Sequence, residues 1–348
     1  MARAVLHQLE IRRPKHQFSQ EHILDWVAKV HAQADQNIDI YIPIRERLLR
    51  LGFGSGKIES RGVAINDCSH ERWDEMELYP ISCMGKKMEV YDRIVRETFT
   101  DWFPSDYVFP AHLIHVTCTG YVAPSPAQKL ISIRAPHTTV THAYHMGCYA
   151  AIPAIRMANG NALVVHSELS SLHMNPHLHS TDQLVIQSLF ADGFARYRVS
   201  QEEVPGYEIL ALQEEIYPDT LETMTWQPAS WGLQMTISRE VPVHIVRALP
   251  GFMQRLEERA GVPLQDAYFA IHPGGPKIIE SVAQALNLHS SQFAHSLSIL
   301  KACGNMSSAT LPHIWEAMWK DIPSGALVVS LAFGPGLTLC GAVFRCRY

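Results

Sequence analysis

Several features that would assign this sequence to a special class are missing from it. No run approaches the ~18 apolar residues of a membrane-spanning helix, and no apolar leader predicts export. The net charge is −5 at pH 7, so there is no basic excess of the kind that marks nucleic-acid binding. We therefore expect a globular, cytoplasmic protein with neither membrane nor nucleic acid as partner.

Paired cysteines are also missing. The seven cysteines are odd in number and form no C-x-x-C motif; they stand at positions 68, 83, 118, 148, 303, 340 and 346. Without an export signal, this pattern predicts free thiols and no zinc site.

What the sequence does contain is an alternation of strand and helix patterns. Its 348 residues, 47% of them apolar, are enough for two domains or one large duplicated domain. Residues 18–34 predict an amphipathic helix capped by Ser19. Residues 113–120 and 162–167 predict buried strands, with a helix between them that begins after Cys148. The fold class is therefore α/β.

The second half repeats this style. Residues 267–275 predict a strand that runs into a glycine turn, and residues 277–286 predict a helix. A further helix follows the pair Ser307 and Ser308, one of which we expect as its cap. Residues 326–346 predict two buried strands around a Gly-Pro-Gly bend. Polar residues, a proline and a glycine at 199–208 predict a boundary, which divides the chain into residues 1–203 and 204–348.

Cys148 differs from the other cysteines in its position. A lone cysteine is most often a small buried hydrophobic residue. Cys148, however, follows Gly147 and opens a predicted helix, where the helix dipole and free N–H groups favour a thiolate. This makes it a candidate nucleophile.

Two other polar residues lie beside glycines at the ends of predicted elements, where α/β folds place their chemistry. His272 ends an apolar strand, and Asn305 precedes the predicted serine cap. Alone, His272 could be a satisfied core or turn residue and Asn305 a turn or cap residue. Cysteine, histidine and asparagine in this order also occur in papain-like proteases, but "MGCYAA" lacks the protease context around the thiol. A cysteine hydrolase stays open as an alternative.

Five segments together resemble the chalcone-synthase-like type III polyketide synthases of the thiolase superfamily. The resemblance runs from about residue 110 to the C-terminus, through "GCYAA", "LFADG", "IHPGGPKIIESV", "GNMSSATLPHIW" and "LAFGPGLTLCGAVF". It implies a duplicated αβαβα layered fold, normally a homodimer, with the active site between an N-terminal half that carries the cysteine and a C-terminal half that carries the histidine and asparagine.

The resemblance also implies roles for individual residues. Cys148, His272 and Asn305 fall on the catalytic triad. Phe190 falls on a gate between the pantetheine tunnel and the cavity. Gly334, Pro335 and Gly336 fall on the segment that shapes the cavity wall.

The expected activity is that of an acyltransferase. A thiolate can hold an acyl group as a thioester and later release it, while His272 and Asn305 stabilise an enolate oxygen during a Claisen condensation. The expected partners are acyl-CoA or acyl carrier protein thioesters, with a malonyl or β-ketoacyl thioester as extender. No metal or other cofactor is required. An α-pyrone or related polyketide of secondary metabolism is the expected product.

Departures from the plant pattern bear on the substrate. Met235 stands where flavonoid-type members have a second gatekeeping phenylalanine, although it could also be core. Leu172 and His173 replace small hydroxyl residues of the aromatic-starter pocket, which favours an aliphatic starter. The first hundred residues look more like bacterial members, including stand-alone ketosynthases that join two carrier-bound chains into an α-pyrone without decarboxylation. The sequence does not separate that reaction from malonyl extension.

A cluster of basic residues in "PIRERLLRLGFGSGKIESRG" is the best candidate for docking the phosphates of CoA or an acidic carrier protein. Arg50 and Lys57 are the residues that we select from it. The alternative is a solvated helix face whose cations pair with Glu46 and Glu59.

Overall fold

The computed structural model describes residues 3–51, 56–80 and 82–348. Its strands are β1 (Val5–Arg12), β2 (His16–Ser19), β3 (Ser60–Val63), β4 (His112–Thr117), β5 (Thr139–Tyr144), β6 (Asn161–Leu169), β7 (Asp192–Ser200), β8 (Gly206–Ile216), β9 (Met224–Ala229), β10 (Gly232–Ile237), β11 (Tyr268–Ile271), β12 (Leu327–Gly334) and β13 (Thr338–Arg347). Its α-helices are α1 (Gln20–Ala34), α2 (Tyr41–Arg50), α3 (Met84–Trp102), α4 (Pro126–Arg134), α5 (Ala151–Met157), α6 (Thr181–Leu189), α7 (Val241–Ala260), α8 (Pro276–Ala285), α9 (Ala294–Cys303) and α10 (Thr310–Asp321).

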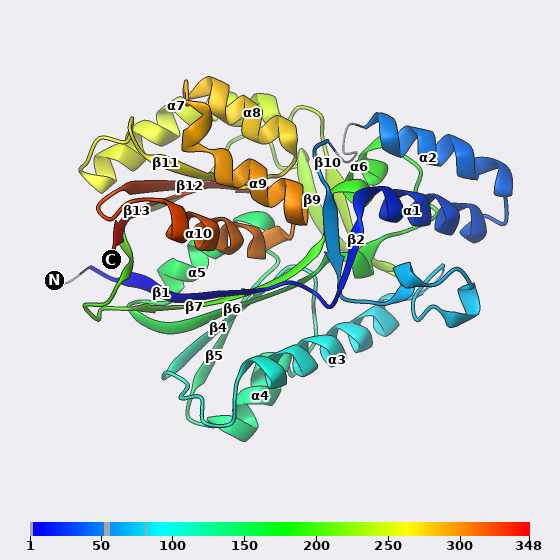
Figure 1. Cartoon of the computed structure of the whole chain (residues 1–348), viewed down its shortest axis with the longest axis horizontal. Coiled ribbons are helices and arrows are strands. Elements are labelled where there is room, and N and C mark those ends of the chain that lie inside the picture. The colour runs from blue at the N-terminus through cyan, green and yellow to red at the C-terminus, as the bar shows by residue number, and fades with distance from the viewer. Residues whose placement is uncertain (1–2, 52–55, 81) are drawn as a thin grey trace.

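The described strands form one large mixed sheet and two small hairpin sheets. The large sheet has nine strands in the order β11-β12-β13-β8-β1-β7-β6-β4-β5. Its two halves meet at β1, which pairs along β7 and, through Val5 and Leu6, with the start of β8. The halves wrap around α5 and α10, with α7 and α8 outside one half and α3 and α4 outside the other (Figure 1). The resulting layers are α, β, α, β and α, as predicted.

The middle helices are buried because both half-sheets cover them. Ile152 of α5 and Leu311, Ile314 and Trp315 of α10 are almost fully buried, in one apolar cluster with residues of both halves. Apolar burial on two sides of a short helix compensates for the weak intrinsic stability of its few turns. Between the halves, residues 201–205 connect β7 to β8. The division at residue 203 stays a prediction.

Several predicted local features are confirmed. The Ser19 hydroxyl caps α1 by accepting the His22 N–H at 3.2 Å, and Ile23, Trp26, Val27 and Val30 are buried. β12 and β13 pair in antiparallel fashion around the Gly-Pro-Gly bend, and all seven cysteines are free. The predicted cap of α10 is wrong: Ser307–Ala309 form a separate 3-10 turn, and the hydroxyl of Ser308 donates to Glu168 instead.

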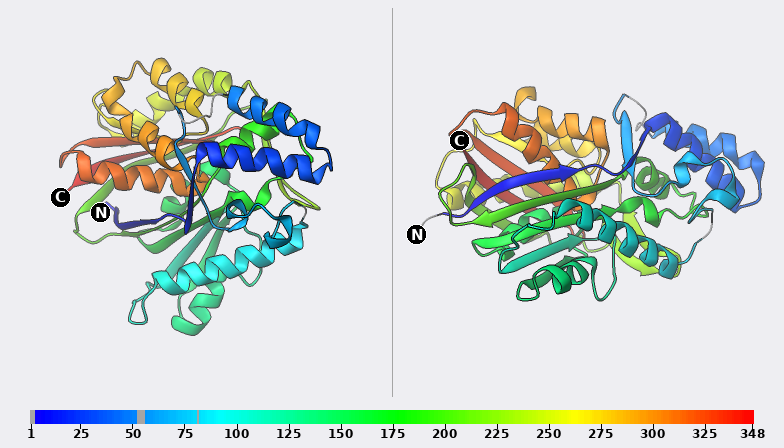
Figure 2. Two further views of the ribbon diagram at one scale, coloured as in Figure 1. Left: turned by 45° about the vertical axis from the view of Figure 1, so that its right-hand side comes forward. Right: turned by 60° about the horizontal axis from the view of Figure 1, so that its bottom comes forward.

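Helices α1 and α2 lie at the end of the molecule opposite both chain termini (Figures 1 and 2). They pack on one another and on α6, and Figure 2 shows the same arrangement from two further sides. Among the described residues, none of the helices combines the length and apolar character that crossing a bilayer requires.

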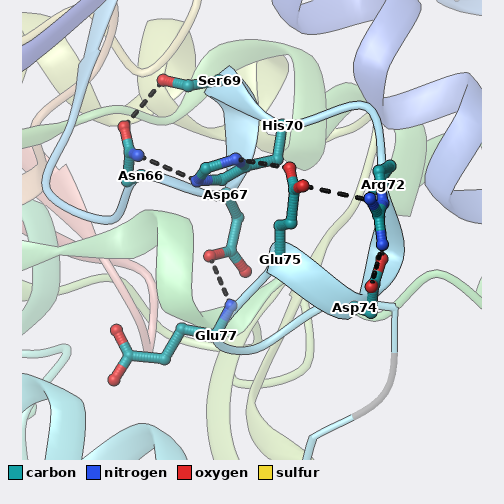
Figure 3. Close-up of polar contacts among 8 residues, drawn as sticks. All are labelled: Asn66, Asp67, Ser69, His70, Arg72, Asp74, Glu75 and Glu77. Carbon is teal, nitrogen blue, oxygen red and sulfur yellow. Dashed lines mark hydrogen bonds and ion pairs between the residues drawn. The ribbon is translucent and has the colours of Figure 1, made fainter.

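The loop after β3 is held together by polar contacts. Buried Asp67 accepts the backbone N–H groups of Glu77, Leu78 and Tyr79 at 2.8, 2.9 and 3.1 Å. Around it, as Figure 3 shows, His70 lies between Asn66 and Glu75. This carboxylate therefore sets the position of the Tyr79 ring.

Replacing Asp67 is expected to destabilise the fold. Asp67→Ala removes the acceptor of three N–H groups, so we expect the free energy of unfolding to fall by about 2–4 kcal/mol in urea titrations. The control is Asp74→Ala, which breaks only an exposed pair with Arg72 and should leave the free energy of unfolding nearly unchanged. Equal losses in the two variants would contradict this account of the loop.

Candidate active site

Cys148 lies in a tight 3-10 turn, Gly147–Tyr149, between β5 and α5. Gly147 has φ +71°, and a Cβ on it would lie 3.2 Å from Cδ of Pro335. A Cβ on Gly334 would lie 2.3 Å from Cδ1 of Tyr149, closer than any packing permits. Two glycines therefore let the bend after β12 pack directly against the turn that carries the thiol.

The structure brings His272 and Asn305 to the same cavity as Cys148. This cavity, which we call the thiol cavity, encloses about 450 Å³, and all three side chains line it. His272 directly follows β11 and donates its backbone N–H to Leu331. Asn305 comes from the turn before α10, and its Nδ2 lies 4.0 Å from the Cys148 Sγ. Three distant segments thus supply a thiol, an imidazole and an amide to one apolar space.

Burial opposes charge on both the thiol and the imidazole. It raises the pKa of Cys148 to about 12, against smaller opposing effects of hydrogen bonds from Ser307 and Asn305. It lowers the pKa of His272 to about 3, and neither ring nitrogen of His272 has a hydrogen-bond partner in the described residues. Each group taken alone is therefore held neutral. Moving a proton from thiol to imidazole costs less than ionising the two groups separately, because it places two opposite charges in one cavity. An imidazolium–thiolate pair of His272 and Cys148 is therefore a prediction.

A polar network that the sequence analysis missed lies behind the thiol. The Ser307 hydroxyl is 3.9 Å from the Cys148 Sγ and 3.0 Å from the Cys118 Sγ. Fully buried Glu168 accepts from the Cys118 N–H at 3.1 Å and from the Thr119 hydroxyl at 2.8 Å. Burial raises the pKa of Glu168 to about 7. A glutamate in the apolar strand "ALVVHSEL" was the available signal, since buried carboxylates occur where partners await them.

Phe190 and Met235 separate the thiol cavity from a second cavity. The second one, which we call the α1 cavity, encloses about 680 Å³ and shares Ile186, Phe190 and Met235 with the first. Met235 is 8% exposed and lies on β10, so it faces both spaces rather than core alone. Gly334, Pro335 and Gly336 are not among the described lining residues of either cavity; Phe333, just before them, lines the thiol cavity.

Trp226 is another residue that the sequence analysis missed. It lines the α1 cavity, donates its indole N–H to the Cys118 carbonyl at 2.5 Å, and packs edge-on against His173 at 6.0 Å. Large rings thus occupy space between Cys118 and the α1 cavity.

The two predicted docking cations, Arg50 and Lys57, each form an ion pair with a different acidic residue. Arg50 lies 3.5 Å from Glu46, and Lys57 lies 2.8 Å from Glu280 on α8. Arg61 of the same sequence cluster is buried. Residues 52–55, which lie between Arg50 and Lys57 in the same stretch, are outside the described residues.

The layered fold around two central helices, with a buried thiol at the start of one, is that of the thiolase-like enzymes. Three solved structures share it over 99% of this chain: the C-terminal type III polyketide synthase domain of Steely1, a type I/III hybrid from Dictyostelium (TM-score 0.85, 22% identity, 100% of that chain), 1,3,6,8-tetrahydroxynaphthalene synthase from Streptomyces coelicolor (0.82, 20%, 99%) and PKS-I from the brown alga Ectocarpus siliculosus (0.80, 23%, 98%).

Sequence comparisons agree with this fold. Residues 208–347 match the family "Chalcone and stilbene synthases, C-terminal domain". "Probable polyketide synthase 1" of Dictyostelium discoideum is 30% identical over 254 residues, 67% of this chain, and "Type III polyketide synthase 21" of rice, Oryza sativa subsp. japonica, is 29% identical over 231 residues, 60% of this chain. Residues 208–347 therefore match the chalcone and stilbene synthase family, and the chain as a whole is similar to type III polyketide synthases. It spans 8% of the length of the Dictyostelium protein and 59% of that of the rice protein.

Cys148 is expected to depend on His272 for its reactivity at neutral pH. In His272→Ala no imidazole can take the thiol proton and burial keeps the pKa of Cys148 high, so its thiolate fraction should rise about tenfold per pH unit from pH 8 to 10. Alkylation by iodoacetamide at pH 7, followed by peptide mass spectrometry, should be at least about tenfold slower than in the wild type. Exposed Cys83 is the internal control. Equal rates at Cys148 in both proteins would show that the imidazole does not accept its proton.

Proposed function

We propose that this protein is a type III polyketide synthase-like acyltransferase that carries an acyl chain on Cys148 and extends it by Claisen condensation. The observation that carries the proposal is the thiol cavity, where thiol, imidazole and amide meet in an apolar space that adjoins a larger one. The similarity of the chain to type III polyketide synthases supports it.

In the loading step, the Cys148 sulfur attacks the carbonyl carbon of an acyl thioester. His272 takes the thiol proton, for which its ring nitrogens are free among the described contacts. A new C–S bond forms, the original one breaks, and the leaving thiolate takes the proton back from His272. The low pKa of His272 favours this return.

In the condensation step, loss of CO₂ from a malonyl thioester leaves an enolate. His272 and the Asn305 amide donate hydrogen bonds to its oxygen, and Asn305 is held in place because its Oδ1 accepts the Ser307 N–H at 2.8 Å. The enolate carbon attacks the acyl group on Cys148, and the Cys148 thiolate leaves. A β-ketoacyl thioester would supply the nucleophilic carbon without decarboxylation by losing a proton from C2 to His272, which would pass it to the Cys148 thiolate when that thiolate leaves.

The finer parts of the proposal concern substrate and assembly. Phe190 acts as a gate and Met235 lines the acyl path, since both face the thiol cavity and the α1 cavity. Gly334, Pro335 and Gly336 shape the thiol cavity by packing behind Cys148. CoA or carrier-bound thioesters are the donors, and a homodimer in the cytoplasm is the expected state.

Docking of the donor is proposed at Arg50 and Lys57. Two further cations are close in sequence to lining residues of the thiol cavity: Arg239 stands between Ile237 and Val241, and Lys277 precedes Ile278. Both are exposed, and neither forms an ion pair with any part of the chain that the structure describes. Arg239 and Lys277 are free to bind a phosphate group, whereas Arg50 and Lys57 would first have to break their ion pairs with Glu46 and Glu280.

Acyl loading is the direct test of the proposed function. Incubation with an acyl-CoA should add one acyl mass per chain, located on Cys148, and Cys148→Ala should abolish it. Carbon–carbon bond formation with malonyl-CoA, read by product mass, distinguishes a synthase from a cysteine hydrolase. An adduct on Cys118 or Cys303, or one that persists in Cys148→Ala, would contradict the assignment of Cys148 as the nucleophile.

Asn305→Ala is expected to separate loading from condensation. The amide changes the charge of the thiol little, so the acyl adduct should form at nearly the normal rate. Condensation should slow ~100- to 1,000-fold, because the enolate loses a donor. Quenched-flow mass spectrometry of the adduct and the product measures both steps. Parallel loss of the two would contradict this division of roles.

Met235→Phe is expected to shift preference towards shorter acyl chains. The ring narrows the passage between the two cavities, while the modest volume change should alter stability little. Rates with acyl-CoA thioesters of graded length are the readout, and Met253→Phe on α7 is the matched control. An unchanged length profile with a large fall in melting temperature would assign Met235 to the core.

A further inference from the structure

The α1 cavity has a mostly apolar wall that continues from the thiol cavity. Ile23, Trp26 and Val27 of α1 form one side of it, and Phe190 and Met235 form the boundary with the thiol cavity. An apolar space next to the reacting thiol suits a hydrocarbon chain whose thioester end reaches Cys148.

Three polar groups in this wall, the Trp26 indole N–H, Arg61 and Ser170, have buried atoms without hydrogen-bond partners among the described residues. Arg61 is 3% exposed; its Nε donates to Gln20 at 2.7 Å, and its Nη1 donates to the carbonyls of Gln187 and Phe190 at 2.8 Å. Its Nη2 has no hydrogen-bond partner among the described residues, and neither does the buried hydroxyl oxygen of Ser170. Both residues line the α1 cavity. Unsatisfied buried polar atoms are costly and rare in native proteins, so three at one cavity point to a ligand that supplies a partner.

The charges nearby indicate what kind of atom this ligand supplies. Buried Asp192 interacts electrostatically with Arg61. It accepts hydrogen bonds from the backbone N–H groups of Ser171 and Ala64 at 2.8 and 2.7 Å. Burial raises the pKa of Asp192 only to about 6, so it is largely ionised at neutral pH and offsets the guanidinium charge. A second carboxylate would leave a net negative charge in an apolar space. A neutral carbonyl or hydroxyl oxygen satisfies the open donor without that cost.

We propose that the α1 cavity binds the acyl chain of an oxygenated substrate, a keto- or hydroxyacyl thioester, and that Arg61 and Ser170 select it by hydrogen bonds to the chain oxygen. This inference rests on the proposed function, because the thioester end of the acyl chain must reach Cys148. Arg61 also holds the carbonyl of Phe190, so it connects the selected oxygen to the residue between the two cavities.

The test compares matched thioesters on matched variants. Alkanoyl-CoA thioesters are paired with the same chains that carry one keto group, placed at successive positions. The wild type should prefer one keto-substituted member. Ser170→Ala should lower kcat/KM for that member about 3- to 10-fold, as expected for one lost hydrogen bond, and leave the plain chain unchanged. Ser132→Ala, on the exposed side of α4, is the control and should change neither.

A binding measurement separates this inference from the proposed function. In Cys148→Ala, the same keto-substituted chain as an N-acetylcysteamine thioester should bind more tightly than the plain chain by calorimetry. Adding Ser170→Ala should remove most of that difference. Arg61→Lys tests the guanidinium, but Arg61 supports three neighbours, so Ser170→Ala carries the decision if Arg61→Lys does not fold.

Failure takes different forms for the two proposals. If no thioester loads Cys148, the proposed function fails. If keto and plain chains load and bind equally well in the wild type and in Ser170→Ala, the synthase stands and the oxygen-selective site is overturned. Equal losses for both chains in Ser170→Ala would also overturn it, because that outcome marks a structural role.

Discussion

A short backbone bridge between Phe190 and Asn305 is the contact on which the site depends. The Asn305 N–H donates to Leu189 at 3.0 Å, and the Ala191 N–H donates to Asn305 at 2.8 Å. These two bonds join the segment after α6 to the turn before α10, more than a hundred residues along the chain. They place the amide of Asn305 near Cys148 and the ring of Phe190 at the wall between the two cavities. Arg61 reinforces the bridge by donating to the Phe190 carbonyl.

Burial has two opposite effects on charge in the thiol cavity. The thiol and imidazole are removed from water, which disfavours an isolated charge on either of them. The same exclusion of water strengthens every hydrogen bond that forms when charge develops on a substrate oxygen. The α1 cavity shows a similar tension, because Arg61 and Ser170 have unpaired buried atoms there. In both places the proposed ligand would supply the polar partner that burial leaves missing.

Elements with strong local patterns could be predicted from the sequence. The cap and apolar positions of α1, the helix after Cys148 and the two strands around Gly334-Pro335-Gly336 all follow from residue spacing and turn chemistry. The cap of α10 could not be predicted in this way. Ser308 has the right residue type and position, but buried Glu168 competes for its hydroxyl, and Glu168 lies on a strand 140 residues earlier in the chain. A partner far away in the sequence therefore binds the hydroxyl that the local capping pattern assigned to the start of the helix.

Residue periodicity alone was enough to predict the α/β class, and the motifs carried the resemblance that implied the layered fold and pointed to Cys148, His272 and Asn305. What surrounds these three residues depended on long-range packing. The fold placed Ser307, Cys118 and Glu168 next to the thiol, packed the Gly334–Gly336 bend against the Cys148 turn, and paired Lys57 with Glu280. It also buried Arg61, which the sequence grouped with solvent-exposed cations. These outcomes depend on which distant segments meet in space, and burial and pairing change the charge and the hydrogen-bonding needs of a side chain in ways that its neighbours in sequence do not reveal.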